Sequence, residues 1–401
     1  MSLPNPAVPV GKLIAATLFA GIVVCIAAAR SRQPTAPAPA PGCGATGSGV
    51  CFYVDAALGS DANPGTSARP FRTLSYAAGG VNPGDWVIVR DGVYTGDARA
   101  VLRINRGGSH ADAGLVVFKA EHKWGAVLDG RSNATDAGVV VNARFVRVQD
   151  FDIRNVWHDG VDIGADAVGL VGNHIHDVGR ICSNSSQGFS AIDIYGSGAN
   201  VVVEGNVVHH VGRFGPGEQG CNPTNTYWQN HDHGMYIHAG NNLVIQNNLF
   251  YDLTHGYQIH FYAGRVSRLS LVNNTFAFPN PNRPGQVLVA EPIDTALIAN
   301  NIFYQPMSHA LEWRVSPSTV TLSNNLSSGP LSSGSPSGVT STGGLENVDP
   351  LFVNPSAFDF HLQASSPARG AALCSAAPTT DVDGVARPAA PCDIGAYGFH
   401  P

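Results

Sequence analysis

The sequence predicts an all-β solenoid, in which the chain coils through stacked rungs of short strands. Six segments rich in leucine and β-branched residues end at an asparagine in the same position, and these asparagines are Asn173, Asn206, Asn248, Asn274, Asn301 and Asn325. Most copies follow one another at intervals in the twenties, and a copy upstream has Phe151 in the asparagine position. Repeats of this length with strand composition are typical of β-solenoids. Because equivalent corners of successive rungs stack, we expect the asparagines to form a hydrogen-bonded ladder.

The overall composition agrees with such a fold. Charged residues make up only 13% of the chain, and its 46 glycines suit many tight turns between short strands. The net charge is −6 and lysines and arginines do not cluster, so we do not expect nucleic acid as a partner. A solenoid grows by adding rungs, so 401 residues are compatible with one monomeric domain.

Residues 1–32 predict a signal peptide or a signal anchor. Residues 13–29 form an uninterrupted apolar run, with Lys12 before it and Arg30 after it. A run of this length is at the short limit for a membrane-spanning helix of about 17–25 residues, so the segment is either cleaved after export or retained as a membrane tether. Residues 33–50 follow as a Pro/Ala-rich linker. The folded part is therefore expected to be secreted, periplasmic or displayed on the cell surface.

Residues 51–131 are expected to contain an N-terminal cap and the first rungs. The run FYVD predicts a strand, and Pro70 to Ala78 can form a short amphipathic helix that covers the open end of the core. The run WVIVRDGVY then predicts the first full strand of a rung. We expect central rungs over residues 132–345 and a closing segment over residues 346–401.

Both ends of the folded part resemble a known family. The segment YVDAALGSDANPGTSARPFRTLSYAAGGVNPGDWVIVRDGVY resembles the N-terminal cap of right-handed parallel β-helix proteins related to pectate lyases. Near the C-terminus, DPLFVNPSAFDFHLQASSPARG and DVDGVARPAAPCDIGAYG are similar to the closing segment of exported bacterial members. The resemblance covers residues 50–398 and implies a single-stranded right-handed parallel β-helix. It implies no single reaction, because that superfamily holds lyases, hydrolases, epimerases and non-catalytic surface proteins.

Six cysteines follow the apolar run, and an even number suggests three disulfides in an exported chain. Short separations favour one local pair at each end of the folded part, which leaves one pair in the middle. The sequence contains no C-x-x-C spacing that would favour a metal site instead. The expected disulfides are Cys43–Cys51, Cys374–Cys392 and Cys182–Cys221.

A second recurring strand precedes the asparagine segments, in the forms GVDIG, AIDIY, GMYIH, GYQIH and ALEWR. Because side chains alternate along a strand, we expect apolar residues such as Val161 and Ile163 to point inward. The outward positions then form two columns, of which one reads Asp162, Asp193, Tyr236, Gln258 and Glu312, and the other Gly164, Tyr195, His238, His260 and Arg314. Packing does not require such residues on an outer face, so these columns predict a binding or catalytic groove.

Two long loops single out the same region of the solenoid. Residues 180–190 and 213–233 lengthen two successive rungs at the same corner, where other rungs have shorter turns. Long loops on a rigid scaffold are where function usually lies. Each loop contains one cysteine, so the Cys182–Cys221 disulfide would join them into a wall beside the outward columns.

A groove of this kind suits β-elimination or epimerisation of a uronic-acid polysaccharide. Such reactions need a base for the proton next to the carboxylate, a cation for the developing enolate and a proton donor. The candidate catalytic residues are His238 or His260 as the base, Tyr236 as the donor and Arg314 as the cation. A calcium ion held by Asp162 and Asp193 could take the place of the arginine. The residues expected to bind substrate are Asp162, Asp193, Gln258, Tyr195, Tyr262, Trp228 and Glu312.

Two other functions stay open from the sequence. Asp162 and Asp193 lie on neighbouring rungs, about 5 Å apart by strand spacing, which suits the carboxyl pair of a retaining glycoside hydrolase. Alternatively the protein is non-catalytic and binds sugars by stacking them on Tyr195, Tyr236, Tyr262 and Trp228. In each case the expected partner is a polysaccharide.

Overall fold

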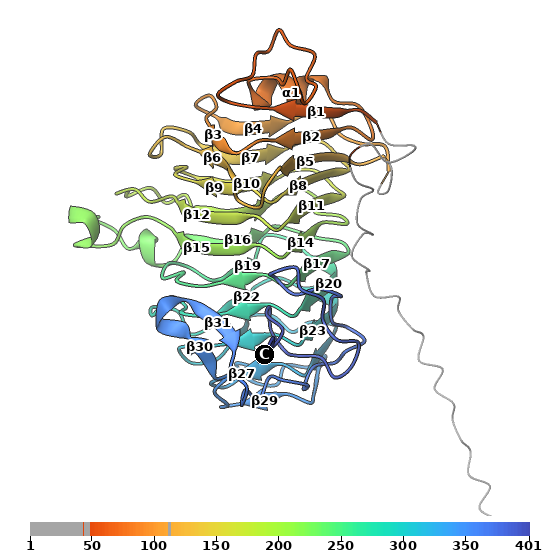
Figure 1. Cartoon of the computed structure of the whole chain (residues 1–401). Coiled ribbons are helices and arrows are strands. Elements are labelled where there is room, and N and C mark those ends of the chain that lie inside the picture. The colour runs from red at the N-terminus through yellow and green to blue at the C-terminus, as the bar shows by residue number, and fades with distance from the viewer. Residues whose placement is uncertain (1–42, 44–48, 111–113) are drawn as a thin grey trace, which may run out of the picture. The chain divides into compact units, whose positions relative to one another are not determined.

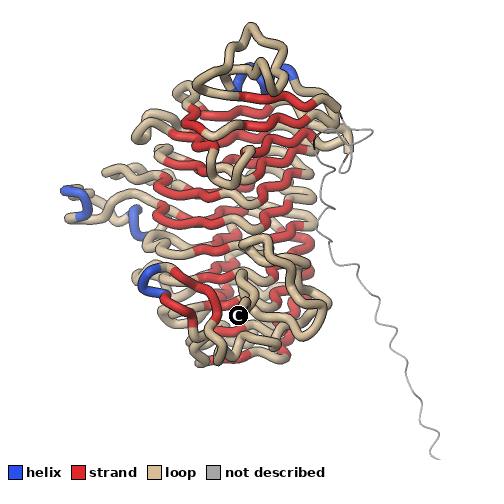
Figure 2. The backbone as a smooth tube through the Cα atoms, viewed as in Figure 1, coloured by secondary structure: helices blue, strands red, loops and turns tan. Residues whose placement is uncertain are grey.

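The computed structural model describes Cys43 and residues 49–110 and 114–401. The expected signal segment, residues 1–32, lies outside the described residues, as does most of the linker. Within the described ranges, no helix is long and apolar enough to cross a membrane. Figure 2 shows that strands and the turns between them make up almost all of this part of the chain.

Three parallel sheets form the solenoid, because successive strands of the coiling chain pass from one sheet to the next (Figure 1). The first sheet consists of β1 (Cys51–Val54), β2 (Trp86–Val89), β5 (Val116–Ala120), β8 (Val146–Gln149), β11 (Val168–Val171), β14 (Val202–Glu204), β17 (Leu243–Gln246), β20 (Val266–Val272), β23 (Ile293–Ala299), β26 (Thr319–Ser323) and β28 (Val339–Thr342). The second consists of β4 (Ala100–Ile104), β7 (Ala137–Val141), β10 (Asp159–Ile163), β13 (Ser190–Ile194), β16 (His233–Ile237), β19 (Ile259–Phe261), β22 (Val287–Val289) and β25 (Leu311–Trp313).

The third sheet consists of β3 (Gly92–Tyr94), β6 (Ala126–Asp129), β9 (Asp152–Arg154), β12 (His174–Val178), β15 (Val207–Val211), β18 (Leu249–Phe250), β21 (Thr275–Phe276), β24 (Ile302–Phe303), β27 (Leu326–Ser327) and β29 (Leu345–Glu346). An antiparallel pair, β30 (Phe352–Asn354) and β31 (Asp359–Leu362), follows it. The helical elements are α1 (Leu74–Gly80) and the single turns η1 (Glu218–Gly220), η2 (Tyr227–Gln229) and η3 (Pro355–Ala357). The expected right-handed parallel β-helix is therefore confirmed.

Inward side chains of all three sheets fill one continuous core. Val161 and Ile163 are fully buried in it, as their alternation with polar residues predicts. Phe250, Phe276 and Phe303 stack on successive rungs, with ring centroids 5.3 and 5.0 Å apart. Stacking of like side chains at equal height packs the core closely, because each rung repeats the shape of the one before it.

The asparagine ladder is confirmed. The Nδ2 group of each buried asparagine donates to the Oδ1 atom of the next over 2.9–3.0 Å, through Asn173, Asn206, Asn248, Asn274, Asn301 and Asn325. Each of these Oδ1 atoms also accepts the backbone N–H of the preceding asparagine. Phe151 ends the ladder, because its backbone N–H donates to the Oδ1 atom of Asn173 over 3.0 Å.

The expected cap and disulfides are also present. Helix α1 buries Leu74, Ala77 and Ala78, and Thr73 caps it by accepting the backbone N–H of Tyr76 over 3.3 Å. The three disulfides are Cys43–Cys51, Cys182–Cys221 and Cys374–Cys392. Bonds of this kind form and persist in oxidising compartments outside the cytoplasm.

The C-terminal segment lies along the outer face of the third sheet. Phe352 and Phe360 of this segment pack in one cluster with outward residues such as Leu249 and Leu326. A second asparagine column, in left-handed turns, donates side-chain N–H groups to carbonyls of the segment, in the pairs Asn247–Thr380, Asn273–Asp393, Asn300–Leu373 and Asn324–Ala371. The segment thus covers β15 to β27 and leaves the outer face of the second sheet to the cleft described next.

Candidate active site

A cleft of about 550 Å³ lies over the outer face of the second sheet. Strands β10, β13, β16, β19 and β22 form its floor, and the two inserted loops, which project from the stack of rungs in Figure 1, form one wall. Six residues that the sequence singles out line it, and these are Asp193, Tyr236, His238, His260, Tyr262 and Arg314. Their shared location agrees with the predicted groove.

The wall is held by a buried ion pair as well as by the expected disulfide. The guanidinium of Arg213 donates to both carboxylate oxygens of Asp232 over 2.9 and 2.7 Å, and both side chains are fully buried. The same guanidinium donates to the carbonyls of Ser185 and Gln187 in the other loop. It therefore joins the loops in a second place. This pair is not among the residues that the sequence predicts for the site, although Arg213 and Asp232 stand at the two ends of one loop.

The pairing of β19 corrects the predicted columns. Tyr236 lies beside His260, not beside Gln258, because β19 pairs with β16 two residues later than the similar sequences GMYIH and GYQIH suggest. Gln258 is buried, and its Nε2 group donates to the carbonyls of Ala277 and Phe250 over 2.7 and 3.2 Å. The prediction that Gln258 faces outward in the groove is wrong, because its amide satisfies carbonyls at a turn.

The same correction changes both columns further along the solenoid. His260 continues the column of Asp162, Asp193 and Tyr236, followed by Leu288 of β22, a rung that the predicted column omits. Ile237 pairs with Phe261, so the residues that follow them, His238 and Tyr262, lie next to each other on adjacent rungs. Tyr262 also lines the cleft. His260 thus takes the position predicted for Gln258, Tyr262 takes the position predicted for His260, and both line the cleft.

His238 forms a pair with Asp193 on the neighbouring strand. The Nε2 atom of His238 lies 3.1 Å from the Oδ1 atom of Asp193. This pairing raises the pKa of His238 against a smaller opposing effect of burial. The contact is an ion pair, because Oδ1 of Asp193 accepts no hydrogen bond from the described residues. A neutral His238 ring with its proton on Nε2 would accept a proton at Nδ1.

Unlike His238, His260 is oriented as a hydrogen-bond donor. Its Nδ1 atom lies 3.2 Å from the Nε2 atom of His233, and the Nδ1 atom of His233 accepts the backbone N–H of Tyr257 over 2.9 Å. His233 therefore carries its proton on Nε2 and donates it to His260, which leaves the His260 proton on Nε2. Burial, together with the charges of Arg283 and Arg314, lowers the pKa of His260 to about 3, so the ring is neutral at physiological pH.

Tyr236 lies between these two histidines. The centroid of its ring is 4.8 Å from that of His238 and 5.1 Å from that of His260, edge to face in both cases. Burial raises the pKa of Tyr236 to about 12, so its hydroxyl keeps its proton. A protonated phenol beside a histidine that can accept a proton is an arrangement suited to acid–base chemistry.

Three carboxylates gather at one end of the site. Oxygens of Asp159, Asp162 and Asp193 lie within 4.8 Å of one another, and the sequence analysis did not include Asp159. Asp159 is buried and forms an ion pair with His158. Burial, and then the charges of Asp159 and Asp193, raise the pKa of Asp162 to about 9. Because a cation among these oxygens would relieve their repulsion, the cluster fits the hard oxygen ligands that calcium prefers.

Two arginines line the other end of the cleft. Arg314 donates to Glu312 over 2.9 Å, and Tyr257 donates to the other oxygen of the same carboxylate over 2.9 Å. Glu312 is thus buried by its partners and positions Arg314 rather than facing the cleft. Arg283, which the sequence analysis missed, has no carboxylate partner among the described residues, and its guanidinium lies over the ring of Tyr257.

The remaining predicted residues lie outside the lining of the cleft. Tyr195 is exposed on the same sheet face, with its hydroxyl 3.4 Å from the side chain of Asn142. Trp228 belongs to an inserted loop and packs against the ring of His255, with centroids 5.7 Å apart. Asp162 does not line the cleft, and it belongs to the site only as a member of the acidic cluster with Asp159 and Asp193. Sugar stacking on Tyr195 and Trp228 therefore has no support from the cleft itself.

Comparison with known proteins agrees with this architecture. A family model described as the Pel9A-like right-handed β-helix region matches residues 52–212, and one described as the right-handed β-helix region matches residues 137–325. The uncharacterized protein YwoF of Bacillus subtilis (strain 168) is 29% identical over 171 residues, which cover 41% of this chain and 30% of that protein. The chain thus matches less than a third of that relative's length.

One solved structure shows a similar fold. The crystal structure of pectate lyase Pel9A matches with a TM-score of 0.56 at 13% identity, over 88% of this chain and 97% of its own. A rhamnogalacturonan lyase matches with a TM-score of 0.44 at 16% identity, over 76% of this chain and 91% of its own. With three stacked parallel sheets, an asparagine ladder and two family matches that together span residues 52–325, the chain is a right-handed parallel β-helix protein with a region similar to the Pel9A-like family.

Proposed function

We propose that this protein acts on a uronic-acid polysaccharide, by β-elimination or by epimerisation at the carbon next to the carboxylate. The observation that carries the proposal is the pair of His238 and Asp193 in a cleft whose far end holds Arg283 and Arg314. The base lies at one end, and Arg283 at the other end has no carboxylate partner among the described residues. This arrangement suits a substrate that carries both an acidic C–H group and a carboxylate.

The protonation state of each residue determines its role in the reaction. The Nδ1 atom of His238 removes the proton next to the carboxylate, while Asp193 stabilises the imidazolium that forms. Arg283 and Arg314 pair with the substrate carboxylate as negative charge moves onto it. Tyr236, still protonated, donates to the leaving glycosidic oxygen in an elimination, or to the opposite face of the same carbon in an epimerisation. His260 donates its Nε2 proton as a fixed hydrogen bond and does not act as the base.

Calcium belongs to the proposal through the acidic cluster. Asp159, Asp162 and Asp193 would hold the ion, which when bound would add positive charge at the end of the cleft that holds His238. Because Asp193 also pairs with His238, the cluster connects cation binding to the orientation of the base.

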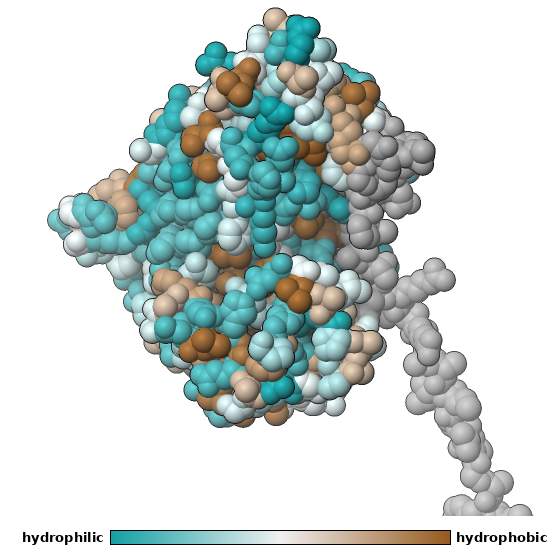
Figure 3. Space-filling model, viewed as in Figure 1, coloured by the Kyte–Doolittle hydropathy of each residue, from teal (hydrophilic) through white to brown (hydrophobic). Residues whose placement is uncertain are grey.

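The comparisons support this choice of substrate to the extent that the similar solved structure is a pectate lyase. On the face shown in Figure 3, hydrophobic residues are scattered among hydrophilic ones. The three disulfides and the predicted signal segment suit a protein that meets its substrate outside the cytoplasm.

The test is incubation of the purified protein with polymers of galacturonate, of mannuronate and guluronate, and of neutral sugars. Elimination produces an unsaturated uronate that absorbs in the ultraviolet, and epimerisation in heavy water places deuterium next to the carboxylate without breaking the chain. Either result on an acidic polymer, with neither on the neutral ones, supports the proposal. Reducing ends without ultraviolet absorbance, or binding without any chemical change, would overturn it.

One observation favours hydrolysis as a second candidate. Asp162 keeps its proton at physiological pH, because its pKa is raised to about 9, and it lies beside Asp193. A protonated and an ionised carboxyl group at short separation are the pair that a retaining glycoside hydrolase uses. Against this, Asp162 does not line the cleft, whereas Asp193 does. The reducing-end assay above separates the two candidates.

A further inference from the structure

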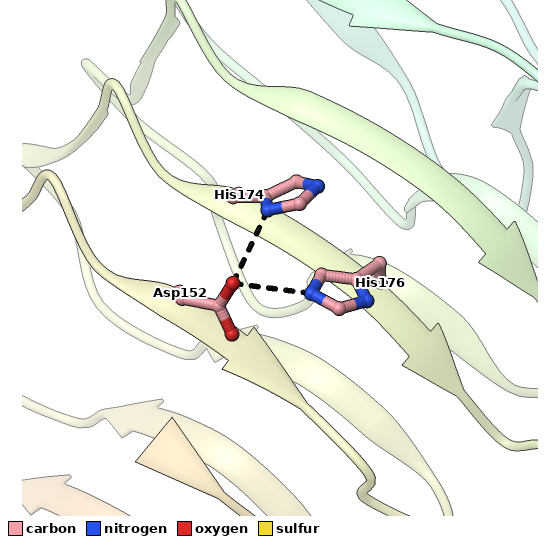
Figure 4. Close-up of side chains that lie close together, drawn as sticks. All are labelled: Asp152, His174 and His176. Atoms are coloured by element: carbon pink, nitrogen blue, oxygen red, sulfur yellow. Dashed lines mark hydrogen bonds and ion pairs between the residues drawn. The ribbon is translucent and has the colours of Figure 1, made fainter. Parts of the chain in front are cut away.

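A second cluster of titratable side chains lies on the outer face of the third sheet, away from the strands that form the cleft. Its centre is Asp152 of β9 with His174 and His176 of β12 (Figure 4). The same Oδ2 atom of Asp152 lies 3.2 Å from the Nδ1 atom of His174 and 3.2 Å from the Nε2 atom of His176. Two ring nitrogens therefore converge on one carboxylate oxygen.

The cluster continues into a chain of histidines. The Nε2 atom of His174 lies 2.7 Å from the Nε2 atom of His209, and the Nδ1 atom of His209 lies 2.7 Å from the Nδ1 atom of His210. The Nε2 atom of His210 then lies 2.8 Å from a carboxylate oxygen of Asp252. On the other side, the Nδ1 atom of His176 lies 2.7 Å from Asp177.

Counting protons shows that neutral rings cannot satisfy this network. The chain from Asp152 through three rings to Asp252 contains four contacts, and each contact needs one N–H proton, whereas three neutral rings supply three. His176 lies between two carboxylates and needs two protons, whereas a neutral ring supplies one. With every ring neutral, the network is therefore short of two protons.

The shortfall falls at the shared oxygen when every other contact is made. His176 then donates from Nδ1 to Asp177, and His174 donates from Nε2 to His209. His209 donates from Nδ1 to His210, which donates from Nε2 to Asp252. The two nitrogens that remain without protons are those that face Asp152. In this arrangement the lone pairs of both nitrogens are available to a metal ion beside the same carboxylate oxygen.

The geometry suits a transition metal. Bonds of about 2.0–2.1 Å to histidine nitrogen and carboxylate oxygen in a tetrahedron place the ligand atoms about 3.3 Å apart, close to the two separations of 3.2 Å. All three ligand atoms lie within 4.8 Å of one another. The ligands come from one carboxylate and two imidazoles, a set that zinc accepts in sites with an open fourth position.

The surroundings hold both rings in the orientation that a metal requires. A metal-binding histidine typically donates its second N–H group to a carboxylate or another acceptor, which fixes its tautomer. Asp177 accepts from His176 in this way, and His209 accepts from His174. The ring of Trp124 lies against His174, with centroids 4.8 Å apart, so the site is pre-formed.

We propose that Asp152, His174 and His176 bind one zinc ion, or another divalent transition metal, which joins two successive rungs of the third sheet. The residues lie on paired strands, with His174 beside Asp152 in the register of β9 and β12. Bound metal therefore acts as a cross-link on the solenoid, separate from the acidic cluster of the second sheet. It stabilises the folded chain because the unfolded chain has no preformed site.

The experiment titrates Zn²⁺ into the purified full chain after removal of metals by dialysis against a chelator. Calorimetry gives the stoichiometry and affinity, and Co²⁺ in place of Zn²⁺ reports nitrogen and oxygen ligation in its visible spectrum. We expect one ion for each chain and a higher melting temperature with zinc than without it. Zinc binding that is absent, or that leaves the melting temperature unchanged, would overturn the proposal.

Variants locate the ion. Asp152→Asn keeps the shape of the side chain and should weaken zinc binding at least tenfold, and the double variant His174→Ala/His176→Ala should abolish it. His122→Ala is the matched control, because His122 is an exposed histidine paired with Asp91 outside the cluster, and Asp193→Asn tests the acidic cluster. If the double variant fails to fold, Asp152→Asn decides alone. Binding that Asp152→Asn leaves intact, or that Asp193→Asn removes, refutes the assignment.

Discussion

The substitution Asn248→Ala tests the structural role of the asparagine ladder. The buried side chain of Asn248 makes four hydrogen bonds: it donates to the carbonyl of Val203 over 2.9 Å and to the Oδ1 atom of Asn274 over 3.0 Å, and it accepts the backbone and side-chain N–H groups of Asn206 over 2.9 and 3.0 Å. Alanine would remove all four at once.

The expected loss of stability follows from the polar groups that Asn248→Ala leaves without a hydrogen-bond partner. The side chain of Asn206 keeps its bond to the carbonyl of Leu170, but its backbone N–H loses the acceptor that it has in the ladder. An unpaired buried group costs about 1–3 kcal/mol, because the desolvation of the group is no longer compensated. With the lost donor to Val203 and the small cavity that remains, we expect the free energy of unfolding to fall by about 2–4 kcal/mol.

The assay is urea unfolding followed by circular dichroism, with Asn354→Ala as the control. Asn354 is an exposed asparagine with negative φ (−154°), outside the ladder. We expect a lower urea midpoint for Asn248→Ala and an unchanged midpoint for the control, and a broader transition if only neighbouring rungs lose stability. Equal midpoints for Asn248→Ala and the parent chain would refute the argument that the ladder stabilises the fold.

Three predictions concern the site. His238→Ala should lower turnover of an acidic polymer by about 10²-fold or more without changing the melting temperature, and activity that persists would exclude His238 as the base. In the parent chain kcat/KM should rise with pH through the raised pKa of His238, because only the deprotonated ring accepts a proton. The substitution Asp193→Asn should move that rise to lower pH. If the pH profile does not move, the rise belongs to another titrating group. Asp232→Asn should lower the free energy of unfolding by about 3–5 kcal/mol, because it leaves the guanidinium of Arg213 buried without its counter-charge; calorimetry checks this, and an unaltered transition would contradict it.

Local patterns account for what the sequence determined by itself. The asparagines recur at one corner because a buried turn needs the same hydrogen-bonding group in every rung, so their register could be read without coordinates. The cysteines pair as predicted, since two pairs are close in sequence and the third joins loops on neighbouring rungs. The inward residues of β10, β13 and β16 also follow directly from alternation.

Two possible starting residues of a strand can give the same alternation of side chains. In that case only the tertiary structure decided where the strand begins. GMYIH and GYQIH look alike, yet β19 begins after Gln258 because that amide satisfies the carbonyls of Ala277 and Phe250 at the preceding turn. Such a choice depends on the carbonyls that other rungs leave unpaired, which no local pattern encodes. A two-residue shift keeps the alternation intact, so His260 stays in the site while its neighbours change.

The same reason explains the charged groups that the sequence analysis missed. Arg213 finds Asp232 at the far end of a long loop, and Asp152 meets His174 and His176 on the next rung. In each case the residues are unremarkable along the chain, and their protonation and pairing arise only when the coil stacks them. The sequence thus determined the solenoid and its ladder, because these depend on repetition; the electrostatics of both clusters depend on which side chains from separate rungs share one buried space, and the tertiary structure alone decided that.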